Sequence, residues 1–317
     1  MLRTLVRDKA NLVAECGDWV RWMQKSLDQM NVRVHRAVSD LDGATGMAMV
    51  QAIVAGERDP RKLAQFRDPH CRKSEAEMAE QLTGHWREDH LFSLEQALKM
   101  YQSIQDRMAD YERKILEKLI AMQQEDLQQQ DPPPLVRPQK AKAIRKRGQE
   151  AKRRALYRMS GVDLTGIDAV GVETVEVVLS EYGPDLSRFP TEKHFVSHVT
   201  LAPHVAKSGG KPLKRKKAHS TSSRVAAALR MAALSLRHSE TALGAYYRKL
   251  KNRVGGDVAV FATARKIATL IYRMLRWGQP YVDEGAQAYE ARYQQIRLKT
   301  LAAKAKELGY QLTAIPA

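Results

Sequence analysis

The stretch that decides the fold is EDHLFSLEQALKMYQSIQDRMADYERKILEKLIAM, residues 88–122. Apolar side chains recur in it at a seven-residue interval and form two seams. The first seam is Leu94, Tyr101, Met108, Ile115 and Met122, and the second is Ala97, Ile104 and Tyr111. Lys118 interrupts the second seam. Three to four heptads of this kind are typical of a coiled coil. The pattern predicts a long helix that begins at about Glu88.

A second long amphipathic helix is predicted over residues 2–30, where apolar residues recur at spacings of three, four and seven. The two long helices could pair as a hairpin, or the coiled coil could form with a second chain. A long surface helix packed on its own domain is the third alternative. We favour oligomerisation, because both helices carry near-heptad stripes.

Shorter helices are expected between these two. Residues 47–55 form an apolar run that Gly56 and Pro60 bring to an end. Ser74 and Glu77 have the spacing of a capping box, in which each side chain bonds the other residue's backbone amide. This spacing predicts the start of a further helix.

The clearest domain boundary is QQEDLQQQDPPPLVRP, residues 123–138, because three consecutive prolines cannot continue a helix. The sequence predicts a helical oligomerisation region, a Gln/Pro-rich and basic linker, and a C-terminal domain. Their respective bounds are 1–130, 131–158 and 159–317.

The second half also has helical patterns, and a short strand near 175–180 is the one exception considered. The expected helices cover residues 174–179, 224–236, 258–277 and 283–308. The predicted fold class is mainly α.

Positive charge is concentrated in two short blocks. The chain has 317 residues and a net charge of +17, with 53 Lys and Arg against 36 Asp and Glu. Residues 137–154 and 207–224 together carry 15 of the 17 excess charges. Each block alone could be a solvated linker or loop. Two such blocks favour binding to a polyanion, most plausibly nucleic-acid phosphates.

Several function classes are disfavoured. A mean hydropathy of −0.48 and the lack of a long apolar run argue against a membrane span. Cys16 and Cys71 are too few for a disulfide framework or a four-cysteine zinc site. Walker, zinc and dinucleotide motifs do not occur, and no carboxylate cluster suggests a metal site. We expect a reducing cytoplasm.

A glycine-rich segment, GIDAVGV, occupies residues 166–172 and precedes an apolar helix. This order resembles a helix-hairpin-helix element, whose glycine turn lets backbone amides approach a phosphate. A tight turn between core helices is the alternative. The predicted nucleic-acid contacts are Gly171, Lys207, Lys211, Lys214, Arg215, Lys216, Lys217, Arg224, Arg145, Lys146 and Arg147.

The best candidate nucleophile lies in the cluster Ser220, Thr221, Ser222 and Ser223, between a lysine run and an alanine-rich helix. A hydroxyl at a helix N-terminus lies among unpaired amides, where a phosphate also docks. Serine and threonine are, however, common N-caps. Because no general base is obvious, such a serine needs activation from outside the segment.

Two stretches carry a family resemblance. The C-terminal one is GIDAVGVETVEVVLSEYGPDLSRFPTEKHFVSHVTLAP…SGGK…TSSRVAAALRMAALSL. The N-terminal one is WMQKSLDQMNVRVHRAVSDLDGATGMAMVQAIVAGERDPRKLAQFRD with LTGHWREDHLFSLEQALKMY. Together they resemble transposases of the IS-one-ten insertion-sequence family, closest to the eleven-eleven subgroup.

The resemblance implies bacterial, nucleoid-associated DNA transposition and recombination. Family members pair an RNase H-like domain, which holds magnesium on four acidic residues, with a domain whose serine attacks a DNA phosphate. It further implies a structured guide RNA and oligomers joined through the coiled coil. By resemblance the catalytic residue is Ser223, with Ser222 as the alternative register.

The resemblance also implies a departure. The sequence begins where the family's helical region begins, so we expect an N-terminally truncated chain that lacks the RNase H-like domain and its magnesium. Two hypotheses follow. The chain is the serine half of a recombinase, or it is a non-catalytic nucleic-acid-binding remnant that oligomerises through its coiled coil.

Overall fold

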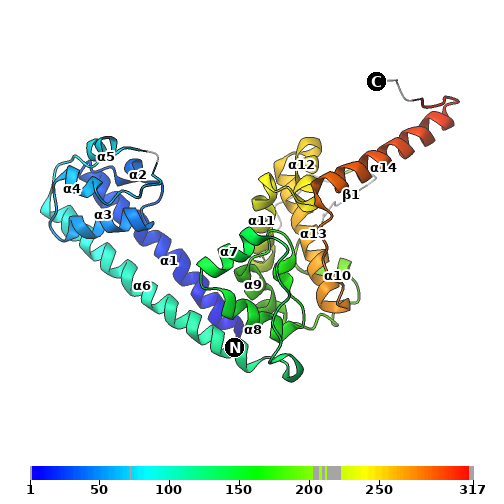
Figure 1. Cartoon of the computed structure of the whole chain (residues 1–317), viewed down its shortest axis with the longest axis horizontal. Helices are drawn as coiled ribbons and strands as arrows, with labels where there is room; N and C mark the ends of the chain where they lie inside the picture. The colour runs from blue at the N-terminus through cyan, green and yellow to red at the C-terminus, as the bar shows by residue number, and fades with distance from the viewer. Residues whose placement is uncertain (1, 72, 203–206, 209–210, 213–222, 314–317) are drawn as a thin grey trace. The chain divides into compact units, whose positions relative to one another are not determined.

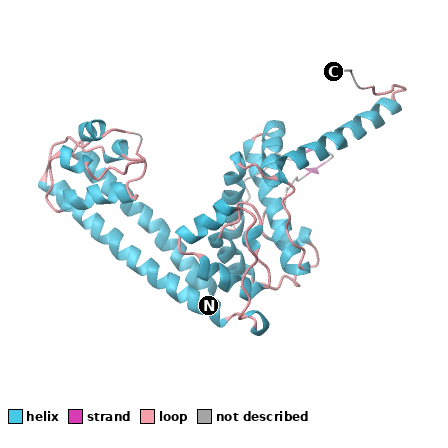
Figure 2. Ribbon diagram, viewed as in Figure 1, coloured by secondary structure: helices cyan, strands magenta, loops and turns pink. Residues whose placement is uncertain are grey.

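The computed structural model confirms a mainly α fold (Figure 2). The residues that it describes are 2–71, 73–202, 207–208, 211–212 and 223–313. The chain forms two compact units, residues 1–115 and 116–317. The predicted three-part division stays a prediction.

The first unit is an assembly of two long and several short helices (Figure 1). Its elements are α1 (Leu2–Gln29), α2 (Val34–Ala37), α3 (Ala44–Val54), α4 (Pro60–Ala64), α5 (Glu75–Gln81) and α6 (Glu88–Ala121), whose last residues enter the second unit. The predicted capping box is present, because Ser74 Oγ accepts from the Glu77 amide and Glu77 accepts from the Ser74 amide. The long helix begins at Glu88, as its heptads predict.

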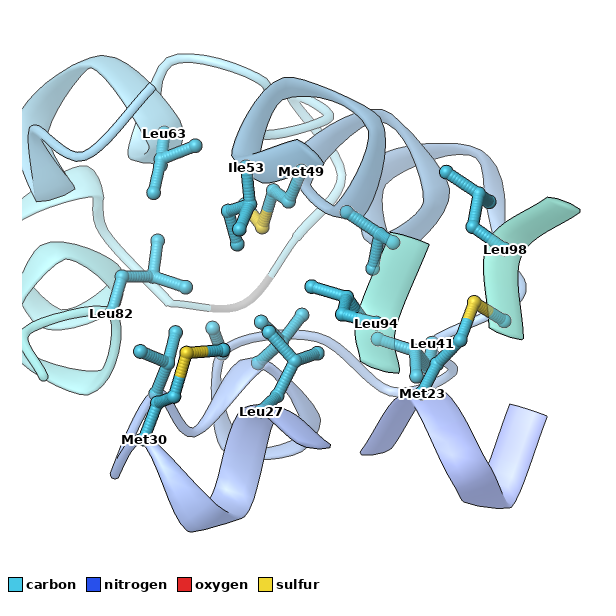
Figure 3. Packing of buried hydrophobic residues seen from close by; sticks show 14 of the residues in the cluster. Met23, Leu27, Met30, Leu41, Met49, Ile53, Leu63, Leu82, Leu94 and Leu98 are labelled. Atoms are coloured by element: carbon cyan, nitrogen blue, oxygen red, sulfur yellow. The ribbon is translucent and has the colours of Figure 1, made fainter. Parts of the chain in front are cut away.

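The core of the first unit lies where the short helices cover the paired ends of α1 and α6. Figure 3 shows apolar side chains from α1, α3, α4 and α6, and from the segments that follow α1, α2 and α5, converging. The labelled residues are Met23, Leu27, Met30, Leu41, Met49, Ile53, Leu63, Leu82, Leu94 and Leu98, all buried. Helix bounds in this unit follow from where apolar periodicity starts and stops.

Helices α1 and α6 run antiparallel in the first unit. Lys9 Nζ bonds Glu112 at 2.9 Å, and Gln105 Nε2 lies 3.4 Å from the sulfur of Cys16. Of the heptad seams, Leu94, Ala97, Ile104 and Ile115 are buried and Met122 is exposed. The hairpin alternative is therefore supported for these two helices, and a coiled coil between chains stays a prediction.

In the second unit, the other helices pack around two central ones, α11 (Arg224–Ser235) and α13 (Gly256–Trp277). Its first elements are η1 (Glu125–Leu127), α7 (Pro138–Lys146), α8 (Glu150–Ser160), η2 (Leu164–Gly166), α9 (Val172–Tyr182), α10 (Glu192–His198), β1 (Lys207–Ser208) and β2 (Lys211–Pro212). These are followed by α11 (Arg224–Ser235), η3 (Leu236–His238), α12 (Ala242–Val254), α13 (Gly256–Trp277) and α14 (Gly285–Glu307). Helix α13 packs against α10, α11 and α12, and α11 also contacts α9.

The β-branched run near 175–180 lies inside α9 and is helical. Val175, Val178 and Leu179 are buried there at helical spacing, so tertiary packing decides against the short strand. The Gln/Pro-rich stretch ends α6, but the basic block after it forms α7 and α8.

Candidate nucleic-acid interface and serine site

Ser223 is the N-cap of α11. Its Oγ accepts a hydrogen bond from the backbone amide of Ala226 at 3.4 Å, a long distance for such a bond. The side chain is half-buried. It lies at the positive end of the α11 dipole, which stabilises negative charge on a nearby oxygen or phosphate. The geometry thus meets the description of a cap and leaves the hydroxyl in a setting suited to phosphate.

Helix α11 holds Ser223 on a rigid support. Its alanine-rich sequence lets neighbouring helices approach closely, and it packs against α9 and α13. The buried face consists of Val225, Ala226, Leu229, Ala232 and Ala233. The position of the Ser223 backbone is therefore set by the core of the second unit.

The other predicted nucleic-acid contacts near Ser223 lie at the start of α11, on two short strands, or outside the described residues. Arg224 opens α11 and is exposed. Lys207 and Lys211 lie on the adjacent antiparallel strands β1 and β2, where Lys207 pairs with Pro212 and Ser208 with Lys211. The predicted residues outside the described part of the chain are Ser222, Lys214, Arg215, Lys216 and Lys217.

Gly171 is the N-cap of α9, and no side chain caps this helix end. The space that a Cβ on Gly166 or Gly171 would occupy is open to 4 Å, so the backbone is accessible at both positions. The left-handed residue of the segment is Ala169, with φ of 65°. The helix-hairpin-helix likeness stays a prediction, although the loop does connect α8 with α9.

The first basic block is divided between two roles. Arg145, Lys146 and Arg147, the three predicted contacts, are exposed at the end of α7. The Gln149 amide, two residues beyond them, bonds the carboxylate of Glu173 in the first turn of α9 at 3.0 Å. The exposed cations therefore lie close in the fold to the uncapped end of α9.

Other cations of the block point inward and hold the glycine-rich loop. Lys140 Nζ donates to the carbonyl oxygens of Thr165 and, at 2.7 Å, of Ile167. Arg153 bonds Asp163 at 2.5 Å and Thr165 Oγ1 at 3.0 Å. Burial lowers the pKa of Lys140 to about 8. Lys140 and Arg153 therefore stabilise the loop, and this part of the positive charge of residues 137–154 does not face a polyanion.

A buried acidic residue anchors the same loop to the C-terminal helices. Arg137 bonds Asp168 at 2.8 Å and Asp283 at 2.6 Å, and the Tyr281 hydroxyl donates to Asp168 at 2.9 Å. Burial raises the pKa of Asp168. Lys140 follows Arg137 at helical spacing, which is the only local signal of this inward face.

A metal ion has no evident place among these residues. In the part of the chain that the structure describes, no three His, Cys, Asp or Glu side chains are grouped as ligands. The donor set does not fit magnesium, and we derive no step through a metal on this chain. Over the same residues, no helix is long and apolar enough to cross a membrane.

Comparison with protein families gives one match. Residues 162–248 match the family described as Transposase IS116/IS110/IS902. The matched region contains the glycine-rich loop, α9, α10 and Ser223 with α11. No similar protein was found among curated proteins or solved structures. Residues 162–248 are thus similar to a domain of the IS116/IS110/IS902 transposases, which supports a role in DNA transposition or recombination, with DNA as the partner.

Proposed function

We propose that the chain is the serine-bearing part of a DNA transposase and that Ser223 forms a covalent link to DNA. The observation that carries the proposal is the place of Ser223, at the N-terminus of a core helix inside the family-matched region. Ser223 combines a hydroxyl with the positive end of a helix dipole and a basic neighbour, Arg224.

In the proposed step, Ser223 Oγ attacks the phosphorus of a DNA phosphodiester. The serine loses its proton as the Oγ–phosphorus bond forms. The bond from phosphorus to one deoxyribose oxygen breaks, and that oxygen leaves as a hydroxyl after taking up a proton. The amides and dipole at the start of α11 stabilise the charge that develops on the phosphoryl oxygens.

Two surfaces are proposed to hold the rest of the DNA. The exposed cations Arg145, Lys146 and Arg147 neutralise backbone phosphates, and the backbone amides at the start of α9, after Gly171, donate hydrogen bonds to another phosphate. Lys207 of β1 and Lys211 of β2 are proposed as further phosphate contacts. A structured guide RNA presents the same phosphate chemistry and is the second polyanion that the proposal includes.

The proposal assigns metal chemistry to a separate RNase H-like domain. Among the described residues, no metal ligands are grouped, and the group that bonds Ser223 Oγ is the Ala226 amide, which cannot act as a base. Activation of the hydroxyl therefore comes from the partner domain when both hold the same DNA strand.

The test is covalent capture of end-labelled DNA in a mixture of this chain, a family RNase H-like domain and magnesium. Wild-type protein should give a labelled band that survives denaturing electrophoresis. Ser223→Ala should abolish the band while DNA affinity stays within about twofold, because the lost hydroxyl contributes little to phosphate binding. Ser235→Ala, at the other end of α11, is the matched control and should keep the band.

Two results would contradict the assignment. A band that persists in both Ser222→Ala and Ser223→Ala excludes the assignment of the nucleophile to Ser223 or Ser222. A band lost equally in Ser235→Ala shows that the effect comes from damage to α11.

A second function is favoured by one observation: Ser223 does act as a helix cap. In this case the serine is structural, and the chain binds nucleic acid without cutting it and oligomerises through α1 and α6. Neutralising Arg145, Lys146 and Arg147 would then weaken binding and flatten its salt dependence. The two functions differ only in whether the serine variant changes an activity.

A further inference from the structure

A cavity of about 560 Å³ lies between α12, α13, α14 and the loop before α14, in the second unit. Figure 1 shows these helices in yellow, orange and red. Its lining includes four tyrosines, Tyr246, Tyr281, Tyr289 and Tyr293. The chain has 11 tyrosines in 317 residues, so four in one hollow is a marked enrichment in aromatic rings.

The four tyrosines come from three segments: Tyr246 from α12, Tyr281 from the loop before α14, and Tyr289 with Tyr293 from α14. Tyr246 of α12 meets Tyr289 of α14 edge to face, with centroids 6.4 Å apart and planes at 87°. Burial raises the pKa of both hydroxyls. The rings therefore stay neutral at physiological pH, which suits them to stacking rather than to nucleophilic attack.

Positive charge accompanies the rings. The Lys249 ammonium lies over the ring of Tyr293 and 5.7 Å from the centroid of Tyr289. Lys266 is exposed on the cavity lining. Arg292 contacts Glu284 only at 3.4 Å, with both side chains largely exposed, so solvent screens this pair. A ligand for this cavity combines a flat ring with negative charge.

The cavity continues along α13. A second hollow of about 700 Å³ shares Tyr246, Lys266 and Arg273 with the first. It adds Phe261 and Arg265, and the guanidinium of Arg230, from α11, lies 5.0 Å from the Phe261 centroid. Aromatic and cationic side chains thus line a track from α14 toward α11, the helix that carries Ser223, although Arg273 is paired with Glu192 at 2.7 Å and Asp257 also lines the second hollow.

We propose that this track binds single-stranded nucleic acid, with an unpaired base stacked on the tyrosines of the first cavity. Successive bases that stack on aromatic rings, beside cations that follow the phosphates, are the chemistry of sequence-tolerant single-strand binding. A volume of about 560 Å³ is in the range of small-ligand sites and admits a nucleotide, whereas a duplex does not enter. The proposal adds a site to the proposed function and needs no covalent step.

The test compares affinities of the whole chain for labelled oligothymidine, oligouridine and a DNA duplex by fluorescence anisotropy. In the double variant Tyr289→Leu with Tyr293→Leu, both single strands should bind about tenfold more weakly or worse, the size of a lost base stack. Duplex affinity should change by less than about twofold. The thymidine and uridine arms tell whether the site prefers single-stranded DNA or RNA.

Two control variants accompany it. Changing both tyrosines to Phe keeps the rings and should keep single-strand affinity. Tyr310→Leu makes the same change in an exposed tyrosine outside the cavity and should have no effect. An equal loss for duplex and single strands, or a loss also in Tyr310→Leu, would overturn the proposal.

A second measurement uses the wild-type chain, so it does not depend on whether the double variant Tyr289→Leu with Tyr293→Leu folds correctly. Oligonucleotides that carry iodouracil are photo-crosslinked to the wild-type chain, and the attached peptides are identified by mass spectrometry. Attachment should map to Tyr246, Tyr289 or Tyr293, and attachment only elsewhere refutes the site. Neither measurement contains magnesium or an RNase H-like domain, so failure here is distinct from failure of the serine reaction.

Discussion

The two units bury different kinds of side chain. The core of the first unit is apolar and is built from residues such as Met49, Ile53 and Leu82. Among the described residues of this unit, Ser26 is the one buried polar residue. Among the described residues of the second unit, Lys152, Asp168 and Glu176 are buried as well. Buried charges seldom add stability, but they can hold neighbouring segments in one arrangement. The difference therefore points to the second unit as the place where function is expected.

In the second unit these charges surround the glycine-rich loop and the start of α9. Lys152 and Glu176 pair at 2.6 Å and are nearly inaccessible, with side-chain exposures of 9% and 1%. The pair joins α8 to α9 across the loop. A largely apolar core, like that of the first unit, would hold these two helices together equally well. It would not fix the orientation of the loop between them.

The largest expected effect comes from breaking this pair. Lys152→Met should lower the free energy of unfolding of the second unit by about 3 to 5 kcal/mol, because it removes the ammonium that faces buried Glu176. Urea unfolding followed by hydrogen exchange in α9 measures it. Ile53→Val in the first unit should cost about 1 kcal/mol and leave α9 unchanged.

The double variant Lys152→Met with Glu176→Leu sharpens the comparison. It should regain most of the lost stability, because no charge is then left buried. If Lys152→Met alone costs less than about 1 kcal/mol, the pair is not what distinguishes the two units.

A smaller effect concerns pH. Burial lowers the pKa of Lys140 from 10.5 to about 8. Below pH 8 both states are protonated and burial disfavours the folded state in full. Between pH 8 and 10.5 the unfolded state binds more protons, so stability rises with pH. As the pH rises through this window, the free energy of unfolding of the wild type should therefore increase relative to that of Lys140→Met, by at most about 3 kcal/mol. Urea titrations across this window measure it, and a flat difference contradicts it.

The smallest effect concerns backbone strain in the same loop. Ala169 has φ of 65°, a conformation that favours glycine. Ala169→Gly should raise the free energy of unfolding by about 1 kcal/mol. Ala143→Gly, at an exposed position inside α7, should lower it by about 1 kcal/mol. Thermal unfolding of both variants checks the opposite signs, and a loss in Ala169→Gly argues against strain.

Much of the fold could be predicted because helix bounds depend on local signals. The helix predicted for 2–30 spans 2–29, the one for 224–236 spans 224–235, and the helices predicted for 258–277 and 283–308 span 256–277 and 285–307. The capping box at Ser74 is also present. Periodicity, caps and breakers act within a few residues, so one sequence is enough to read them.

The candidate site was predictable only in part. The position between a basic run and an alanine-rich helix points to the serine cluster 220–223, the family resemblance points to Ser223 within it, and the function of Ser223 remains a proposal. The count of charge in residues 137–154 could not tell inward from outward side chains. Arg137, Lys140 and Arg153 turn inward because loop carbonyls and Asp163 and Asp168 face them, and those partners come from later in the chain.

The sequence by itself determined the helical class, the helix positions, the concentration of positive charge and the candidate serine, because each depends on neighbouring residues. Tertiary structure alone decided which cations bind the glycine-rich loop and which reach solvent. It also decided that Tyr246 and Tyr293, 47 residues apart in sequence, line one cavity. The physical reason is that burial and pairing depend on contacts between distant segments, which a local pattern does not contain.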